Sequence, residues 1–218
     1  MLEQPQPRNH AFSDAADWRA LEEQLGSPEE ATARSASVFS SSLSHVNSPN
    51  ELKQFVIDFQ AGTLANDELP VILRAYNHAL RNEARELVEL DRSLKSSFPN
   101  EALANASQRV GRNQLRRLRA LKTERVVTRY WDAVHAKQAT GWHTIVFGVV
   151  LAVYSIPLRQ GLHHYAQQTV CGFLEGGAIS LRLPASELAE LETVVLAGTP
   201  AIVERILSTQ VGGEFRCI

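Results

Sequence analysis

Seven histidines are the side chains of this sequence best suited to chemistry, either as metal ligands or as acid–base catalysts. His163 and His164 are adjacent, so on a helix their side chains point about 100° apart. The sequence contains no HExxH motif, and no carboxylate stands at ligand spacing from this pair. His135 and His143 are separated by a Thr-Gly break. These spacings favour positions at the surface or at the edge of the core over a metal site.

Other nucleophiles and ligands are scattered rather than clustered. Cys171 and Cys217 suit a reducing compartment, and neither has a Cys or His at metal-ligand spacing. The sequence has no Walker-type phosphate loop and no GxSxG motif, and the serine run at 40–42 has no base nearby. We therefore predict no catalytic residue, no metal ligand and no cofactor-binding residue, and we expect that the chain is not an enzyme.

A run of basic residues offers a different kind of site. It consists of Arg109, Arg112, Arg116, Arg117, Arg119, Lys122, Arg125 and Arg129, of which the first, second, third and fifth share one helix face. Such a face could bind phosphates, which makes a helical regulatory or nucleic-acid-binding module the alternative function. A solvated face beside the acidic segment 83–91 is favoured, followed by an acidic protein partner and then by nucleic acid. The net charge of −2 argues against RNA.

The apolar pattern predicts an all-α protein with a single helical domain. The chain has 218 residues, of which 44% are hydrophobic and 21% charged, as is typical of a soluble globular protein. Apolar residues recur at spacings of three and four, and no segment alternates as a strand would. We expect about eight to ten helices, within a domain at 14–209 between flexible tails at 1–13 and 210–218. The N-terminus lacks the pattern of a signal peptide, so we expect a cytoplasmic protein.

The centre of the predicted fold is a buried hairpin over residues 141–183. Residues 145–156 are nearly all apolar, but the run is too short for a membrane span, which needs about 20 apolar residues. Pro157 ends this helix and opens the next one. The second helix carries Gly172, Gly176 and Gly177, whose small size would let another helix backbone approach closely. These glycines are candidates for contact with a second chain.

Start and stop signals divide the rest of the chain into helices. The segment 48–51, Ser-Pro-Asn-Glu, predicts a capping box at the start of a helix, and Gly62 is predicted to end that helix. Pro99 is expected to open a long helix. Near the C-terminus, a break at Gly198 precedes a last short helix over 202–207.

Three motifs follow one another along the chain and carry a resemblance to a known family. They consist of Ala106, Ser107, Gly111 and Arg112; of His143, Gly148, Ile156, Pro157 and Leu158; and of Arg182 and Leu183. Their order and spacing resemble those of the urease accessory protein UreF family. Residues 48–94, which end in a Glu-Leu-Asp run, also resemble the middle helices of that family. The similarity extends over residues 37–207.

This resemblance implies an all-α fold, a homodimer and no catalysis by the chain itself. UreF proteins bridge UreD, called UreH in some organisms, and the GTPase UreG, and the assembly delivers nickel to apo-urease. The resemblance therefore implies a chaperone scaffold for nickel insertion, with UreD, UreG and apo-urease as partners. Neither a membrane nor a nucleic acid is an expected partner.

The chain departs from the family in two segments that lie at dimer and partner surfaces. Of the family's N-terminal signature, Phe39 and Ser42 are present, whereas its Pro and Gly positions hold serines. The family's Gly-x-x-x-Gly-Gln run is replaced by residues 186–192, which contain neither Gly nor Gln. These departures concern dimerisation and UreG recruitment more than the fold.

The resemblance also suggests which residues contact partners. Arg182 would be either a charged anchor for a partner or a cation at a helix end. Arg112 and Ser107 stand beside a glycine that permits close helix packing, so a structural role is favoured for both. His143 is expected to cap or pack at the start of the buried helix. The candidates for partner binding are Phe39, Ser42, Arg112, Gly172, Gly176, Gly177 and Arg182.

Overall fold

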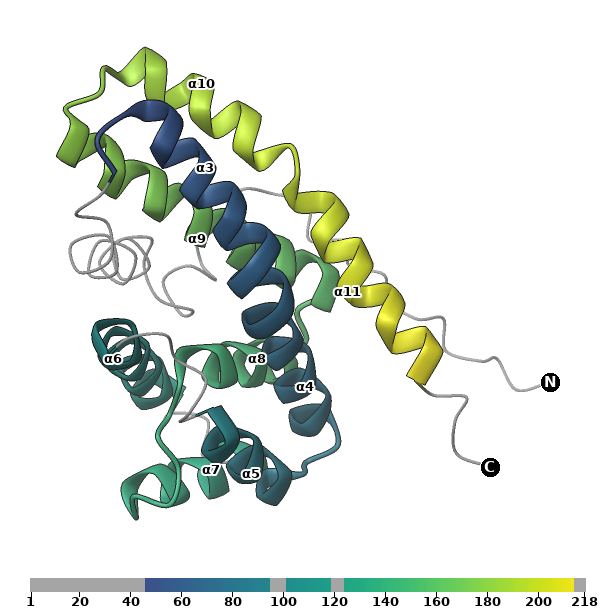
Figure 1. Cartoon of the computed structure of the whole chain (residues 1–218). Coiled ribbons are helices and arrows are strands. Elements are labelled where there is room, and N and C mark those ends of the chain that lie inside the picture. Colours follow the sequence, from purple (N-terminus) through teal and green to yellow (C-terminus); the bar gives the residue numbers. More distant parts are fainter. Residues whose placement is uncertain (1–45, 95–100, 119–123, 214–218) are drawn as a thin grey trace.

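The computed structural model describes residues 46–94, 101–118 and 124–213 (Figure 1). Over these residues the chain is helical and has no strand, so the predicted all-α class is confirmed. The helices are α3 (Pro49–Phe59), η1 (Gln60–Glu68), α4 (Leu69–Leu80), α5 (Ala84–Ser93), α6 (Glu101–Leu118), α7 (Arg125–His135), α8 (His143–Val153), α9 (Leu158–Leu181), α10 (Ala185–Leu196) and α11 (Thr199–Gly213). The predicted number of helices and the domain boundaries stay predictions, because they depend on residues outside the described ranges.

Helices α3, η1 and α4 form one continuous rod. Ser48 caps its start as predicted: the Ser48 Oγ accepts a hydrogen bond from the N–H of Glu51 at 3.3 Å, and the Glu51 carboxylate accepts one from Asn47 at 2.7 Å. The prediction that Gly62 ends the first helix is wrong, because the backbone continues through it as the π-helix η1. Burial of Leu64 in the core offsets the cost of a glycine inside a helix, which is about 1 kcal/mol.

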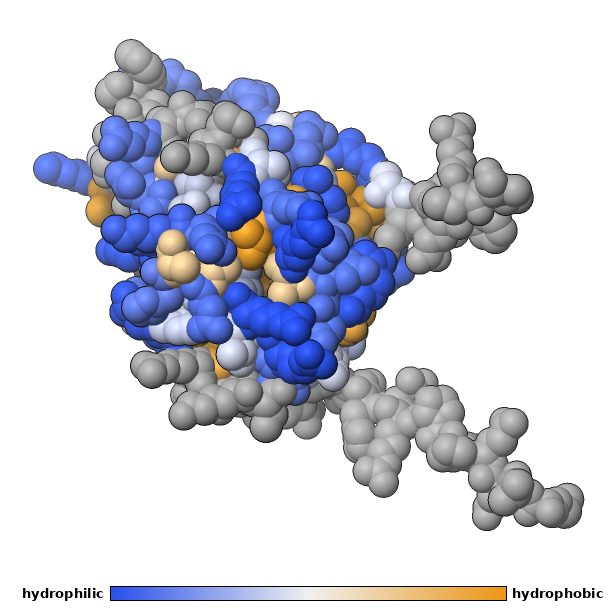
Figure 2. Space-filling view, turned by 90° about the horizontal axis from the view of Figure 1, so that it is seen from below, coloured by the Kyte–Doolittle hydropathy of each residue, from blue (hydrophilic) through white to orange (hydrophobic). Residues whose placement is uncertain are grey.

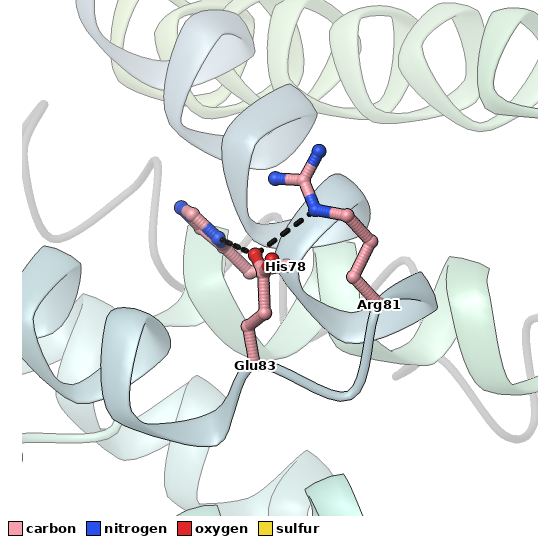
Figure 3. A network of polar contacts seen from close by, with 3 residues as sticks. All are labelled: His78, Arg81 and Glu83. Carbon is pink, nitrogen blue, oxygen red and sulfur yellow. Dashed lines mark hydrogen bonds and ion pairs between the residues drawn. The ribbon is translucent and has the colours of Figure 1, made fainter.

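The turn between α4 and α5 is held by charged side chains (Figure 3). The Oε2 atom of Glu83 lies 2.7 Å from Nδ1 of His78 and 3.0 Å from Nε of Arg81. These contacts lower the pKa of Glu83, with the hydrogen bond to His78 as the largest cause. Asn82 takes a left-handed conformation in the turn, with φ 57°, which asparagine tolerates better than most residues.

Helix α8 lies at the centre of the described core. Every residue from His143 to Ala152 is buried, as the uncharged sequence predicts. The helix packs mainly against α4 and α6. Gly148 lets the α4 backbone come close, since an added Cβ would lie 2.6 Å from the carbonyl oxygen of Ile72. Helix α9 packs instead against α3, α10 and α11 (Figure 1). The predicted buried hairpin is therefore not confirmed as a packed pair, although Pro157 does separate α8 from α9.

After α9, helix α10 runs along the upper side of the molecule in Figure 1, and α11 continues from it down the right-hand side. Helix α9 ends at Leu181, and its C-cap residue Arg182 has a left-handed backbone with φ 54° and ψ 43°. The predicted break at Gly198 is present, between α10 and α11. Helix α11 is longer than the last helix predicted from the sequence. No helix in the part of the chain that the structure describes has both the length and the hydropathy to cross a membrane.

Candidate functional site

The carboxylate of Asp91 is the centre of a buried hydrogen-bond network between α5, α7 and the loop before α8. Asp91 is 0% exposed, and its Oδ2 accepts hydrogen bonds from the Tyr130 hydroxyl at 2.6 Å and from the N–H of Gly141 at 2.9 Å. The N–H of Thr140 donates to Oδ1 at 2.5 Å, and that of Trp142 to Oδ2 at 3.4 Å. The loop is therefore fixed by one side chain that satisfies several backbone donors.

One further hydrogen bond stabilises this network. The indole N–H of Trp142 donates to the backbone oxygen of Asp91 at 2.9 Å, so side chain and backbone of both residues face each other. Burial, followed by the charge of Asp91, raises the pKa of Tyr130 well above its usual value. The phenol of Tyr130 therefore remains a hydrogen-bond donor rather than an acid.

Helix α6 supports the same loop from the other side. The Ser107 Oγ accepts a hydrogen bond from the N–H of His143 at 3.2 Å, and the Arg112 Nε donates to the Thr140 carbonyl at 2.9 Å. Gly111 lies against the loop backbone, so that an added Cβ would clash with the Gly141 carbonyl and lie 2.7 Å from the His143 nitrogen. The favoured structural interpretation of Ser107 and Arg112 agrees with these contacts.

The side chain of His143 packs at the start of α8, one of the two roles expected for it. Its ring centroid lies 5.4 Å from that of Tyr165 and 5.9 Å from that of Phe147. The Tyr165 hydroxyl in turn donates to the buried carboxylate of Glu68 at 3.0 Å. These contacts join α8 and α9 to η1. We call the contacts of Asp91, Ser107, Gly111, Tyr130 and residues 140–143 the loop anchor.

A groove lies beside the loop anchor, between α6, α7 and the loop that follows α7. Its volume is about 500 Å³, and we call it the α6–α7 groove. Figure 2 views the molecule from the end where α5, α6 and α7 lie and shows hydrophobic patches set among strongly hydrophilic side chains. The groove is lined by Gln108, Arg112, Leu115, Arg116, Trp131, Val134, His135, Lys137, Ala139 and Thr140.

Residues 46–177 match the family model UreF, which is more than half of the chain. The chain belongs to the UreF family of urease accessory proteins. The matched residues include the whole loop anchor and the α6–α7 groove. UreF is an accessory family and not a catalytic one, so the family assigns a role in urease maturation. No curated protein matches the chain.

The structure separates the partner-binding candidates of this UreF-family chain. Arg112 forms one wall of the α6–α7 groove and is exposed. Arg182 is exposed at the end of α9 and is not among the residues that line the groove. The three glycines Gly172, Gly176 and Gly177 are buried within the single chain. Phe39 and Ser42 lie outside the described residues. The site is therefore not one cluster, and contact of each candidate with a partner stays a prediction.

The members of the basic run that the structure describes are exposed on α6 and α7, whereas Arg119 and Lys122 lie outside the described residues. Arg109, Arg112 and Arg116 are exposed on α6, as are Arg125 and Arg129 on α7. Among the described residues, no ion pair joins these five arginines to a glutamate of α5 or of the turn before it. Glu89 forms an ion pair with Arg85 of its own helix, and the carboxylate of Asp91 accepts the buried hydrogen bonds of the loop anchor.

Two of the described groups that could do chemistry, Cys171 and His164, are held in unreactive forms. Burial raises the pKa of Cys171 to about 11, and the charges of Glu192 and Glu175 add to this shift, so the thiol stays protonated near neutral pH. Burial lowers the pKa of His164 to about 4. Within the described ranges, no group of three or more His, Cys, Asp or Glu side chains could hold a metal ion.

Sequence reasoning missed the role of Asp91 and the α6–α7 groove. A signal for Asp91 was present, because Leu87 stands four residues before it and Leu94 three residues after it, which places Asp91 on the buried stripe of α5. A charged residue on such a stripe needs buried partners. The groove depends on how α6 and α7 pack against each other, and a local sequence pattern does not predict that packing.

Proposed function

We propose that this chain is the scaffold that bridges UreD and the GTPase UreG during nickel insertion into urease. The observation that carries the proposal is the family match over residues 46–177, which includes the first two of the three motifs that resemble those of UreF, whereas Arg182 and Leu183 lie beyond it. The proposal includes a homodimer, which the family resemblance implies, and a cytoplasmic location, which remains the prediction made from the sequence.

The packing of the described helices supports a scaffold role. A scaffold must hold its binding surfaces in a fixed relation, and the loop anchor joins α5, α6, α7 and the start of α8 through buried hydrogen bonds. Such a network resists local opening because each broken bond would leave a buried donor unsatisfied. Partner proteins would therefore meet surfaces whose shape changes little on binding.

Co-purification tests the proposal. The tagged chain is expressed with UreD, UreG and the urease subunits of its own source, and the sizes of the complexes are measured by light scattering after gel filtration. We expect the chain to retain both UreD and UreG. If the chain is folded and helical by circular dichroism yet retains neither protein, it has kept the family fold without the proposed role.

The homodimer is tested separately at an exposed apolar residue. Gly176 is buried within one chain, so a larger side chain there would disturb α9 itself. Ile179 is 77% exposed one turn later, beside Arg182. We expect Ile179→Glu to reduce self-association in sedimentation experiments, whereas Leu80→Glu, at another exposed apolar position, serves as the matched control. Equal association of both variants would remove this end of α9 from the dimer interface.

A further inference from the structure

The α6–α7 groove has the composition of a docking site for an acidic polypeptide. We propose that it binds a carboxylate-bearing segment of a partner protein, with an apolar side chain of that segment on the groove floor. This inference rests on the proposed function, because it assumes a protein partner in the urease assembly. It names a surface that the family match alone does not assign.

The floor of the groove is apolar and already fixed. Leu115 is 0% exposed and Ala139 is 7% exposed, and the partly buried Val134 and Trp131 complete the surface. An aliphatic or aromatic side chain placed here would remove apolar area from water on both partners, at about 25 cal/mol per Å². Trp131 is also of the residue type that most often supplies interface energy.

The rim of the groove is cationic. Arg112, Arg116 and Lys137 line it together with His135, and none of its described lining residues is acidic. The hydrogen bond from the Arg112 Nε to the Thr140 carbonyl holds that guanidinium against the groove wall. Arginine binds carboxylates through two parallel hydrogen bonds, so a pre-positioned guanidinium favours an acidic partner in particular.

A second hollow differs from the α6–α7 groove in the charges of its lining residues. It lies between α5 and α7, has a volume of about 530 Å³, and contains Arg85, Arg92 and Arg129. Glu89 also lines it and forms an ion pair with Arg85 at 3.1 Å, while the Arg92 Nε donates to the Gln138 carbonyl. This hollow supplies its own carboxylate, whereas the α6–α7 groove leaves that role to a partner.

The loop that forms one edge of the groove is built before any partner arrives. Lys137 takes a left-handed conformation with φ 58°, and its N–H donates to the Val134 carbonyl at 3.1 Å. The next residue, Gln138, donates to the Ala133 carbonyl at 2.8 Å, and Asp91 fixes the loop from Thr140 onward. A preformed site avoids the cost of ordering a loop on binding, which increases affinity.

A protein segment fits these features better than a nucleic acid does. The apolar floor matches an aliphatic anchor, whereas single-stranded nucleic acids require aromatic side chains in succession for base stacking. The described lining holds one large aromatic side chain, Trp131, and the imidazole ring of His135, whose centroid lies 5.7 Å from that of Trp131. The chain also carries a net charge of −2, which gives no overall attraction to a polyanion.

Photo-crosslinking in the assembled complex tests the inference. A benzoyl-phenylalanine replaces Gln108, a neutral lining residue, so that all rim cations are kept. The same group at Gln54, exposed on α3, is the matched control. The variants are expressed with UreD, UreG and the urease subunits, irradiated, and the attached peptides are sequenced by mass spectrometry. We expect position 108 to capture a peptide rich in Asp and Glu, and position 54 not to capture it.

Charge reversal on the rim of the groove provides a second test of the inference. We expect Arg116→Glu to weaken binding of the captured partner about tenfold at low salt, with the loss shrinking as salt is added. Arg74→Glu, on exposed α4 surface away from the groove, should leave that affinity unchanged. Circular dichroism confirms that both variants remain folded.

The outcomes separate the two proposals. If UreD and UreG co-purify but position 108 captures no partner peptide, or a peptide without carboxylates, the groove inference is overturned and the scaffold stands. Capture of nucleic acid at position 108 also overturns it, in favour of the phosphate-binding interpretation of the basic run. If neither partner co-purifies, the proposed function fails, and the inference that depends on it fails too.

Discussion

Helices α8 and α10 are almost equal in length, at 11 and 12 residues, but they have opposite surroundings. Helix α8 is buried from its first residue to Ala152, between α4 and α6. In α10 the buried residue is Val195, and apolar Val194 is 52% exposed. We call α8, the helices α4 and α6 that pack against it and the loop anchor the frame, because they hold the fold together. We call α10 and α11 the outer layer, whose exposed surface is available to other molecules.

The family match follows the same division. It ends at residue 177, inside α9, so α8 and the loop anchor belong to it and α10 and α11 lie beyond it. The motif residues Ser107, Gly111 and His143 all contact the loop before α8 rather than solvent. These motifs therefore identify the frame, and surfaces for partners have to be sought beside it, in the α6–α7 groove and at the end of α9.

The largest expected effect is at the centre of the frame. Asp91→Ala would leave the Tyr130 hydroxyl and the N–H groups of residues 140–142 without their buried acceptor. We expect a loss of roughly 4 kcal/mol in the free energy of unfolding, measured by urea denaturation. Glu89→Ala, exposed on the same helix, should change it by less than about 1 kcal/mol. A loss below about 1 kcal/mol for Asp91→Ala would show that the loop anchor is not essential to the frame.

The comparison between the two helices can be tested with one truncation in each. Leu151 is 0% exposed in α8, and we expect Leu151→Ala to cost about 3 kcal/mol through lost burial and a residual cavity. Val194→Ala, in α10, should stay within about 0.5 kcal/mol because this side chain is half exposed. Thermal and urea unfolding give both values. Similar losses at the two sites would abolish the distinction between frame and outer layer.

Two glycines test the same comparison, because the backbone of one packs closely against another segment and the other has open space beside it. Gly111→Ala forces a Cβ against the loop backbone, and we expect it to cost about 2 kcal/mol. Gly62→Ala is the control, because an added Cβ there meets no atom within 4 Å, and it should stabilise the helix by about 0.5 to 1 kcal/mol. If both substitutions stabilise the chain, α6 does not approach the loop as closely as described.

Arg182 lies at the boundary between α9 and α10, and two substitutions there separate strain from charge. Arg182→Gly removes a non-glycine residue from a left-handed position and should stabilise the chain by about 1 kcal/mol, whereas Arg182→Ala keeps the strain. If Arg182 anchors a partner, both variants lose binding in co-purification with UreD and UreG. Retained binding by both would leave Arg182 as a helix-end cation alone.

The smallest expected effect is at the edge of the frame, in the turn between α4 and α5. The pKa of Glu83 is lowered in the folded chain, so its contribution is present above the ordinary pKa and is lost as pH falls through the lowered value. The stability difference between the wild type and Glu83→Gln should therefore shrink on acidification, as measured by urea midpoints across pH. Ser186→Ala, at an exposed position of α10 without a titratable group, should show no such trend. A difference that grows towards low pH would contradict the contact geometry.

Local patterns predicted what depends on neighbouring residues. The capping box at Ser48, the burial of α8 and the break at Gly198 follow from side-chain type and spacing. Gly62 did not end its helix, because tertiary burial on either side of it outweighed its low helix propensity. The burial of Asp91 and the α6–α7 groove depend on contacts between segments far apart in the chain. The groove was out of reach for that reason, although its cations were visible in the basic run.

The central claim is that this chain serves urease maturation. The direct measurement is the nickel content of urease purified from cells that lack their own UreF and express this chain, together with the other accessory proteins and urease subunits of its own source. The account predicts that nickel and urease activity return when the chain is present and stay absent in cells that do not express it. Urease that remains free of nickel, although the folded chain is present at normal levels, would contradict the account.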